Sequence, residues 1–387
     1  MPRTVTLVLA DPDGALLGAL PSFTVDSPWW QEVAEVVAGA GIEVDVLRLL
    51  HADREHPPGG HVTYLAETRA HPDGLIPLGA DPALHPRRAP WAVPGGPAAS
   101  LAWAAGALDR LGLTGLTPLQ MRTWNLSAIW AFLSPERSPV AWLKQVPSFY
   151  AHEPAVLSLV DEVAPGLVPY VMAAGGDGRM LLAHAPGEDR YGAGLDVCTA
   201  VMHAFAPVQE YFAGRIPELL TSGLPDHRLD AGRFACVAGP YLDGIPGLPE
   251  LIDGLPARLA AAAECGLPDT LIHGDLHPGN VRTAPDGLVI VDWGDGGVGS
   301  PVFDVLRLTE DLDDPGPLVT AWAARWRAAV PGCEPERAVD LLRPVAALRG
   351  AVTYAGFLAE IEPAEWPYHS ADVPGCLETA ARLSGAV

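Results

Sequence analysis

The chain has 387 residues, and 47 acidic against 24 basic side chains give it a formal net charge of −23. Nucleic acids and anionic membranes are bound through basic surfaces, so this charge argues against both as partners. No apolar run approaches the length of a membrane span. The five cysteines are scattered and form no CxxC pair, which is typical of reduced thiols, so we expect a cytoplasmic protein. The length favours two or three folding units.

Residues 1–92 are predicted to form a small α+β domain. Its strands are predicted at 4–10, 15–20, 42–50 and 62–67, where apolar residues form short runs between turn residues. The first run lacks the basic region and the cleavage site of a signal peptide. Between the second and third strands, apolar residues at helical spacing predict a helix over 29–40.

The order of these elements, with the phrase QEVAEVVAGAGIEVDVL, resembles part of a Nudix hydrolase domain. The resemblance implies a helix whose clustered glutamates bind metal. Glu32 and Glu35 are present, but Val36 stands where a second adjacent glutamate is expected. Two carboxylates make a poor magnesium site, so a degenerate accessory domain is favoured and a Nudix-type nucleotide hydrolase stays an alternative.

Residues 71–97 are dense in proline and glycine and are predicted to be a linker, with the domain boundary near residue 92. A helix is predicted over 98–111, ended by Gly112. The rest of the segment 93–182 is expected to be mainly a twisted sheet.

Lys144 is the only lysine among the 24 basic residues of the chain. It lies in the run 140–146, which is predicted to be a strand after the turn at Ser138-Pro139. Lysine is a compact point charge that suits phosphate groups, whereas arginine is a planar fork. A strand lysine of this kind is what a kinase uses on the nucleotide phosphates, although a surface lysine kept by accident remains the alternative.

Residues 183–387 are predicted to be mostly helical. Helices are predicted over 251–265, 318–330 and 334–350 from their apolar spacing. A loop and a strand interrupt the helices in the segment LIHGDLHPGNVRTAPDGLVIVDWGD. The strand is predicted over 288–291 and ends at Asp292.

The loop of this segment has the spacing HxDxxxxN, formed by His273, Asp275 and Asn280. Phosphoryl transfer requires a carboxylate that orients the attacking hydroxyl and accepts its proton, and Asp275 fits that role. It also requires an amide oxygen and a second carboxylate that hold magnesium against the nucleotide phosphates. Asn280 and Asp292 fit those roles.

The motifs HGDLHPGN and IVDWGD, followed by GSPVFD, resemble those of the aminoglycoside phosphotransferase and choline kinase family of small-molecule kinases. The resemblance covers roughly residues 95–387. It implies an α+β chain with a two-lobed protein-kinase-like fold, in which 93–182 is the small lobe and 183–387 the large lobe. Residues 1–92 would be the accessory domain.

The resemblance also implies ATP and Mg²⁺ as cofactors and assigns roles to residues. Lys144 would bind nucleotide phosphates and pair with Glu153, or failing that with Glu162, and the backbone at Ala183 and His184 would bind the base. Asp304 and His273 would support the catalytic loop. Weaker candidates for acceptor contacts are Glu360, Glu362 and Trp366, where aromatic rings and carboxylates would suit a cationic group.

We therefore expect a kinase that phosphorylates a hydroxyl of a small molecule, which is aminoglycoside-like, an amino alcohol or sugar-like. The net charge of −23 permits this molecule to be cationic. A nucleotide-binding pseudokinase with a regulatory role is the alternative outside enzymes. The presence of Lys144, Asp275, Asn280 and Asp292 together argues against that alternative, because loss of activity usually removes one of them.

Overall fold

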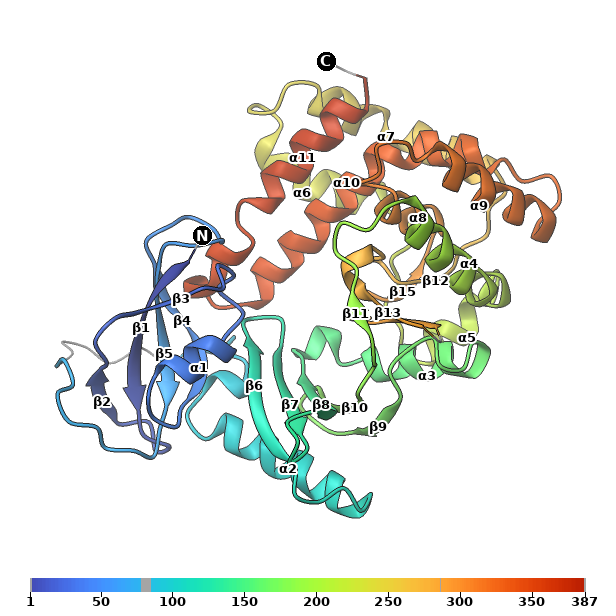
Figure 1. Cartoon of the computed structure of the whole chain (residues 1–387). Coiled ribbons are helices and arrows are strands. Elements are labelled where there is room, and N and C mark those ends of the chain that lie inside the picture. Colours follow the sequence, from blue (N-terminus) through green and yellow to red (C-terminus); the bar gives the residue numbers. More distant parts are fainter. Residues whose placement is uncertain (1, 78–84, 286, 386–387) are drawn as a thin grey trace. The chain divides into compact units, whose positions relative to one another are not determined.

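The computed structural model describes residues 2–77, 85–285 and 287–385 (Figure 1). Residues 78–84 of the predicted linker therefore lie outside the described residues. The chain divides into two compact units. The first contains Met1–Ala151, Val171–His184 and Gly356–Ala371, and the second contains His152–Tyr170, Ala185–Ala355 and Asp372–Val387. Every described helix is too short or too polar to cross a membrane.

The first sheet of the first unit is built from residues before 70. Its strands are β1 (Arg3–Ala10), β2 (Leu16–Ala19), β3 (Phe23–Val25), β4 (Asp45–Ala52) and β5 (His61–Glu67). The order is β2-β1-β5-β4, β3 also pairs with β1, and only the β1–β5 pairing is parallel. Alternate residues of β1, among them Val5, Leu7 and Leu9, are buried in the core of this sheet.

The helix predicted over 29–40 is shorter than expected, because α1 spans only Ala34–Gly39. The cause is the buried side chain of Arg3, whose guanidinium donates to the backbone carbonyls of Ser27, Trp29 and Glu32. The Trp29 carbonyl also accepts from the N–H of Glu32 at 3.1 Å, a three-residue spacing that is typical of a turn. The preceding segment is thereby fixed as an irregular turn.

The second sheet of the first unit is antiparallel and has the order β6-β7-β8-β10-β9. Its strands are β6 (Thr117–Thr123), β7 (Ala128–Leu133), β8 (Pro139–Gln145), β9 (Val171–Ala174) and β10 (Arg179–Ala183). Helix α2 (Gly96–Arg110) follows the 3₁₀ turn η1 (Pro90–Ala92) and packs Ala104, Ala107 and Leu108 into one apolar cluster with the sheet.

Residues 1–92 and the second sheet are joined by backbone and side-chain hydrogen bonds within the first unit. The Gln120 amide donates to the carbonyl of Val46 and accepts from its N–H, both at 2.8 Å. The N–H of Val33 donates to the Met121 carbonyl at 3.0 Å. The first unit also includes the 3₁₀ segments η2 (Ser148–Tyr150) and η5 (Pro363–Tyr368).

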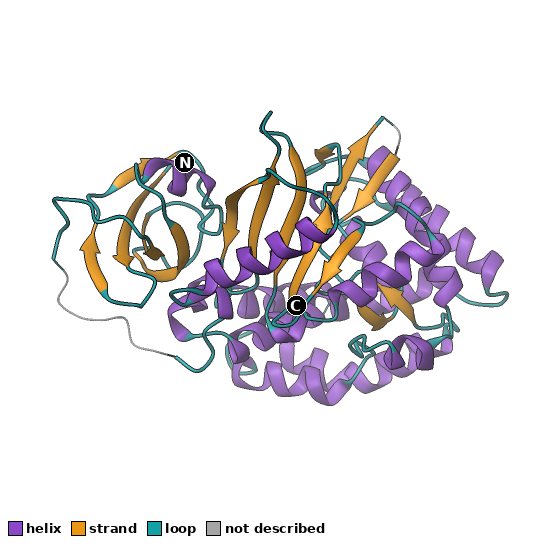
Figure 2. Cartoon of the chain, turned by 90° about the horizontal axis from the view of Figure 1, so that it is seen from below, coloured by secondary structure: helices purple, strands orange, loops and turns teal. Residues whose placement is uncertain are grey.

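The second unit is mainly helical (Figure 2). Its helices are α3 (Glu153–Val163), α4 (Leu195–Phe212), α5 (Ile216–Thr221), α6 (Ala231–Ala238), α7 (Leu248–Glu264), α8 (Val302–Leu308), α9 (Gly316–Ala329), α10 (Pro335–Glu360) and α11 (Asp372–Leu383), with the 3₁₀ turn η3 (Gly239–Tyr241). The end of α10, from Gly356 on, belongs to the first unit.

Two small sheets interrupt these helices. Strand β11 (Glu188–Asp189) pairs with β13 (Val281–Ala284), which pairs with β14 (Gly287–Ile290). Strand β12 (Thr270–Ile272) pairs with β15 (Gly297–Gly299). The loop between β12 and β13, which includes the 3₁₀ turn η4 (Pro278–Asn280), contains the HxDxxxxN motif.

Candidate active site

The loop after β12 begins with a glycine that the backbone requires. Gly274 has φ +84°, a left-handed conformation that side chains disfavour. A Cβ atom there would lie 2.2 Å from the carbonyl oxygen of Asp295. The Gly274 carbonyl in turn accepts from Arg349 Nη1 at 2.7 Å. The loop therefore packs tightly against the turn that follows Asp292.

Asp304 of α8 holds the backbone at the start of this loop. Its Oδ1 accepts from the N–H of Gly274 at 2.9 Å, and its Oδ2 accepts from the N–H of His273 at 3.0 Å. The Gln209 amide donates to Oδ2 at 2.8 Å. Burial raises the pKa of Asp304 to about 6, although these donors oppose the shift. The predicted supporting position of Asp304 thus corresponds to three hydrogen bonds.

His273 is fully buried and occupies the interior side of the loop. Its Nδ1 accepts from the N–H of Asp275 at 3.2 Å, so the proton resides on Nε2, which lies 3.0 Å from the Val291 carbonyl. Burial lowers the pKa of His273 to about 4 and keeps the ring neutral. One neutral imidazole therefore links the residue before Asp292 to the backbone of Asp275.

Both oxygens of the Asp275 carboxylate have donors. Arg307 Nε donates to Oδ1 at 2.7 Å, and the Asn280 amide donates to Oδ2 at 3.2 Å. His277 Nε2 lies 3.5 Å from Oδ2. Burial alone would raise the pKa of Asp275, but the hydrogen bond from His277 and the charge of Arg307 outweigh it and hold the pKa well below its usual range. The group is therefore an oriented carboxylate at neutral pH.

Asn280 and Asp292 present the kinds of oxygen that magnesium prefers. The Asn280 amide nitrogen donates to the carbonyl of Asp275 at 2.9 Å as well as to its side chain, so the amide oxygen is left as an acceptor. The N–H of Val291 donates to the Asn280 carbonyl at 2.9 Å, which ties Asn280 to the strand end before Asp292. Asp292 is exposed and has φ +63°, an uncommon conformation for a residue other than glycine.

The Asn280 amide oxygen and the Asp292 carboxylate are hard oxygen donors of the kind that magnesium binds. No cluster of three or more His, Cys, Asp or Glu side chains that could hold a metal occurs among the described residues. Magnesium takes one or two protein oxygens and completes its shell with water and phosphate oxygens. An amide oxygen and one carboxylate are compatible with that pattern.

Glu153 and Lys144 belong to different units. Glu153 begins α3 and is buried, and its Oε1 accepts from the N–H of Trp293 at 3.1 Å, directly after Asp292. Lys144 is buried on β8, opposite Ile129 of β7 and Met180 of β10. The pairing of Lys144 with Glu153 stays a prediction.

Ala183 and His184 lie at the end of β10, as predicted. Ala183 pairs with Ala141, and the N–H of His184 donates to the Val140 carbonyl at 3.0 Å. The indole of Trp142 donates to His184 Nδ1 at 3.1 Å, which leaves the proton of the neutral ring on Nε2. The backbone position and the ring of His184 are thus both fixed by β8.

The three candidates for acceptor contacts lie in the first unit: Glu360 ends α10, Glu362 lies between α10 and η5, and Trp366 lies in η5. The Glu362 carboxylate is buried and is held by Arg88 at 2.8 Å and by Arg48 at 3.7 Å. Glu360 is exposed, and Trp366 is partly exposed with its indole donating to the Leu358 carbonyl at 3.2 Å. The Glu362 carboxylate is therefore already engaged by two arginines of its own unit.

The sequence did not predict that three further residues support the site: Arg307, Gln209 and Arg349. Gln209 and Arg349 hold Asp304 and the Gly274 carbonyl from distant helices, and no local pattern indicates such contacts. The sequence did contain an indication for Arg307, because this residue follows Asp304 by three positions on the same helix. Residues three apart share a helix face, so an arginine at this spacing is directed toward the loop that Asp304 holds.

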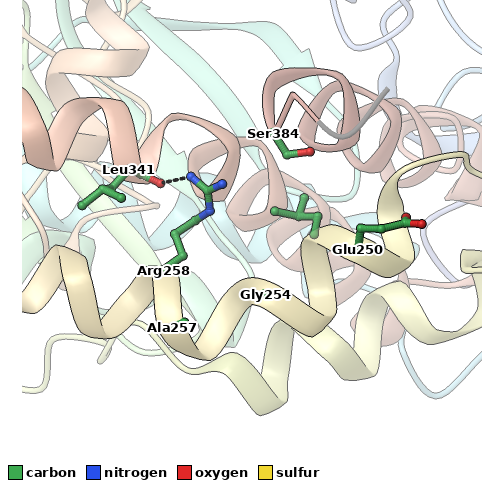
Figure 3. A pocket seen from close by; sticks show the side chains of 7 residues that line it. Glu250, Gly254, Ala257, Arg258, Leu341 and Ser384 are labelled. Atoms are coloured by element: carbon green, nitrogen blue, oxygen red, sulfur yellow. Dashed lines mark hydrogen bonds between the residues drawn. The ribbon is translucent and has the colours of Figure 1, made fainter.

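A separate hollow of about 370 Å³ lies on the second unit (Figure 3). It is lined by α7, by Leu341 of α10 and by Ser384, and Arg258 donates across it to the Leu341 carbonyl at 3.1 Å. No residue of the catalytic loop lines it.

A model of the family described as "Phosphotransferase enzyme family" matches residues 145–339, just over half of the chain. The chain is also similar in fold to solved structures. A choline/ethanolamine kinase family protein from Mesorhizobium loti has 17% identity and a TM-score of 0.50, over 74% of this chain and 94% of that one. No protein of curated function matches the chain in sequence.

Two further structures broaden this likeness. An ethanolamine kinase from Plasmodium vivax has 9% identity and a TM-score of 0.54, over 74% of this chain and 88% of that one. A macrolide 2′-phosphotransferase from Brachybacterium faecium has 15% identity and a TM-score of 0.50, over 73% of this chain and 97% of that one. The expected α+β, kinase-like fold is confirmed.

Proposed function

The chain belongs to the phosphotransferase enzyme family, and on this premise we propose that it is an ATP- and magnesium-dependent kinase that phosphorylates a hydroxyl group of a small molecule. The observation that carries the proposal is the Asp275 carboxylate, which is fixed through both oxygens beside an amide that can serve as a metal ligand. The names of similar structures, among them ethanolamine kinase and macrolide 2′-phosphotransferase, support an acceptor of small size that carries a hydroxyl.

In this proposal Asp275 orients the acceptor hydroxyl toward the phosphate and accepts its proton. Asp275 is ionised at neutral pH, so it can accept a hydrogen bond from the acceptor hydroxyl and take its proton as the new bond forms. His273 and Asp304 keep the loop backbone in place through the hydrogen bonds described above.

The Asn280 amide oxygen and the Asp292 carboxylate would hold magnesium, which neutralises charge on the nucleotide phosphates when bound. Lys144 would contact the same phosphates as a point charge from β8. The backbone at Ala183 and His184 would bind the base, and Glu153 would support the segment that follows Asp292 through its bond to the Trp293 N–H.

For the acceptor we propose an amino alcohol, an aminoglycoside-like or a sugar-like molecule. Glu360 and Trp366 remain candidate contacts for it, whereas Glu362 is engaged by Arg88 and Arg48. Residues 1–92 would serve as an accessory domain, 93–182 as the small lobe and 183–387 as the large lobe.

The test compares Asp275→Asn and Asp292→Ala with the wild type. Nucleotide binding is measured by calorimetry with ATP and magnesium, and transfer is measured by the mass gain of a panel of amino alcohols, aminoglycosides and sugars. Asp275→Asn should bind nucleotide normally and lose transfer by about 1,000-fold or more, because the base and metal roles are separable. Asp292→Ala should also lose the effect of magnesium on nucleotide binding.

Asp313→Asn serves as the control, since Asp313 is an exposed carboxylate of the same unit. It should behave as the wild type in both measurements. Full transfer by Asp275→Asn would contradict the proposed mechanism. A wild type that binds nucleotide without transferring phosphate to any acceptor would instead favour the pseudokinase alternative.

A further inference from the structure

Helix α8 contacts the catalytic loop at two successive points. Asp304 accepts from the N–H groups of His273 and Gly274. One turn later, Arg307 Nε donates to Oδ1 of Asp275 at 2.7 Å. Residues three apart lie on one face of a helix, so the same face of α8 holds the backbone of the loop and the carboxylate that the loop presents.

The contact of Arg307 with Asp275 is itself held from a second side. Arg307 Nη1 donates to Glu310 Oε2 at 2.5 Å, just beyond the end of α8. The guanidinium is planar and keeps its donors in a fixed arrangement, so anchoring one end limits the orientation of the other. With Arg307 on Oδ1 and Asn280 on Oδ2, rotation of the Asp275 carboxylate about its last bond would break two hydrogen bonds.

Partial exposure limits what this ion pair contributes to stability. The side chains of Arg307 and Asp275 are 34% and 38% exposed, so solvent screens part of their attraction. Arg325 and Glu210 form a comparable pair at 2.7 Å with 32% and 30% exposure, on α9 and α4. What distinguishes the pair of Arg307 is that its partner is the carboxylate on which transfer depends.

We propose that Arg307 is a positioning residue of the phosphoryl transfer, which holds the Asp275 carboxylate in the orientation that the acceptor hydroxyl needs. This inference rests on the proposed function of Asp275. A misoriented carboxylate slows the chemical step and leaves nucleotide binding intact, because small displacements of a catalytic group reduce turnover strongly.

The experiment compares Arg307→Met, Arg307→Lys, Arg307→Ala and the matched control Arg325→Met in the full-length chain. ADP formation from ATP with magnesium, measured with water alone or with an acceptor that becomes phosphorylated, gives kcat and KM. Arg307→Met should lower kcat about 10- to 100-fold and leave the KM for ATP within about twofold. Arg307→Lys keeps a donor and should recover part of that loss, and Arg325→Met should match the wild type.

A second measurement separates positioning from folding. In Arg307→Ala, added ethylguanidinium should restore part of the lost kcat, whereas it should not restore Asp275→Asn. The inference about Arg307 would be wrong if Arg307→Met kept the wild-type kcat, or if its affinity for nucleotide fell as much as its kcat. Either result would leave the proposed function of Asp275 standing. Full activity in Asp275→Asn, or a wild type inactive with water and every acceptor, would overturn the proposed function and this inference with it.

Discussion

At the scale of single residues, Lys144 combines a rare residue type with a buried position. It is the only lysine of the chain, and it lies 8% exposed on β8 between β7 and β10. Burial on a strand fixes the position from which the ammonium group is presented, and a kinase uses a strand lysine to contact the nucleotide phosphates. The alternative of a surface lysine kept by accident does not fit this burial.

We predict that Lys144→Arg lowers kcat/KM nearly as much as Lys144→Ala, by about 100-fold or more, because a planar fork cannot replace a compact charge in a packed sheet. An acylating ATP analogue that reacts with lysine gives an independent measurement. It should label one internal site besides the N-terminus, and ATP with magnesium should protect that site. Labelling that nucleotide does not change would contradict the prediction.

Gly274 is the residue where the backbone of the catalytic loop is most restricted. We predict that Gly274→Ala destabilises the protein by about 1 kcal/mol for its left-handed backbone and by a further ~1–3 kcal/mol for the clash with the Asp295 carbonyl. Gly214→Ala isolates the first cost, because Gly214 has φ +73° and open space around its Cβ position. Urea unfolding of both variants measures the difference, and equal losses would show that the loop yields without cost.

At the scale of elements, the sequence predicted those whose side chains follow a regular period. The strand predicted over 140–146 corresponds to β8 (Pro139–Gln145), and the helix predicted over 251–265 corresponds to α7 (Leu248–Glu264). The strands β12 and β15 have three residues each and went unpredicted, because so short a run shows no period. The shortened α1 depends on Arg3, a contact across more than 20 residues.

As with the helices and strands, the candidate site was predictable only where a local sequence pattern existed. His273, Asp275 and Asn280 lie within one short loop, so their spacing alone indicated that they act together. Arg307 and Arg349 contact that loop from α8 and α10, Gln209 of α4 supports Asp304, and only the tertiary fold brings these residues together. Local patterns therefore indicated the candidate reacting groups, which stay a prediction, and the tertiary fold showed the groups that hold them.

The 3₁₀ segment η5 places Glu365 in the interior of the first unit. Burial, and secondly the charge of Glu362, raise the pKa of Glu365 to about 8, although Arg48 and Arg88 oppose the shift. The unfolded chain releases this proton near pH 4.5, so between pH 4.5 and 8 only the folded chain retains it. The resulting stabilisation is fully present below about pH 4.5 and is lost as the pH rises to about 8.

We predict that Glu365→Gln flattens this pH dependence. For the wild type, the free energy of unfolding should contain a term that falls by about 1.4 kcal/mol per pH unit within that window, and the variant should lack it. Urea unfolding at pH 6 and pH 8 measures the term, with the exposed Glu55→Gln as control. An unchanged slope in Glu365→Gln would show that Glu365 is already ionised when buried.

At the scale of the whole molecule, residues 1–92 are part of the first unit and not a separate one. The carboxylates that would serve a Nudix site have other partners there. Glu35 Oε2 accepts from the N–H groups of Asp26 and Ser27 at 2.8 and 3.0 Å, and Glu32 lies 3.5 Å from Arg122. These contacts, with Val36 in place of a third carboxylate, leave a poor metal site.

We predict that the full-length chain has no metal-dependent pyrophosphohydrolase activity on nucleoside triphosphates or diphosphate sugars. The assay uses the Asp275→Asn variant, so that phosphoryl transfer does not consume the nucleotide. It measures nucleoside monophosphate, which is the product of pyrophosphohydrolysis. Adding Glu35→Gln should change nothing. Hydrolysis that disappears in Glu35→Gln would make the chain bifunctional.

Residues 356–371 belong to the first unit, although they are translated after residues 185–355 of the second unit. Arg48 and Arg88 are translated early, but their partner Glu362 lies 274 residues beyond Arg88. A buried guanidinium without its carboxylate is strongly destabilising. During synthesis the nascent first unit must therefore stay incompletely packed while residues 152–355, most of which belong to the second unit, emerge, so strands that are translated early become fully packed late.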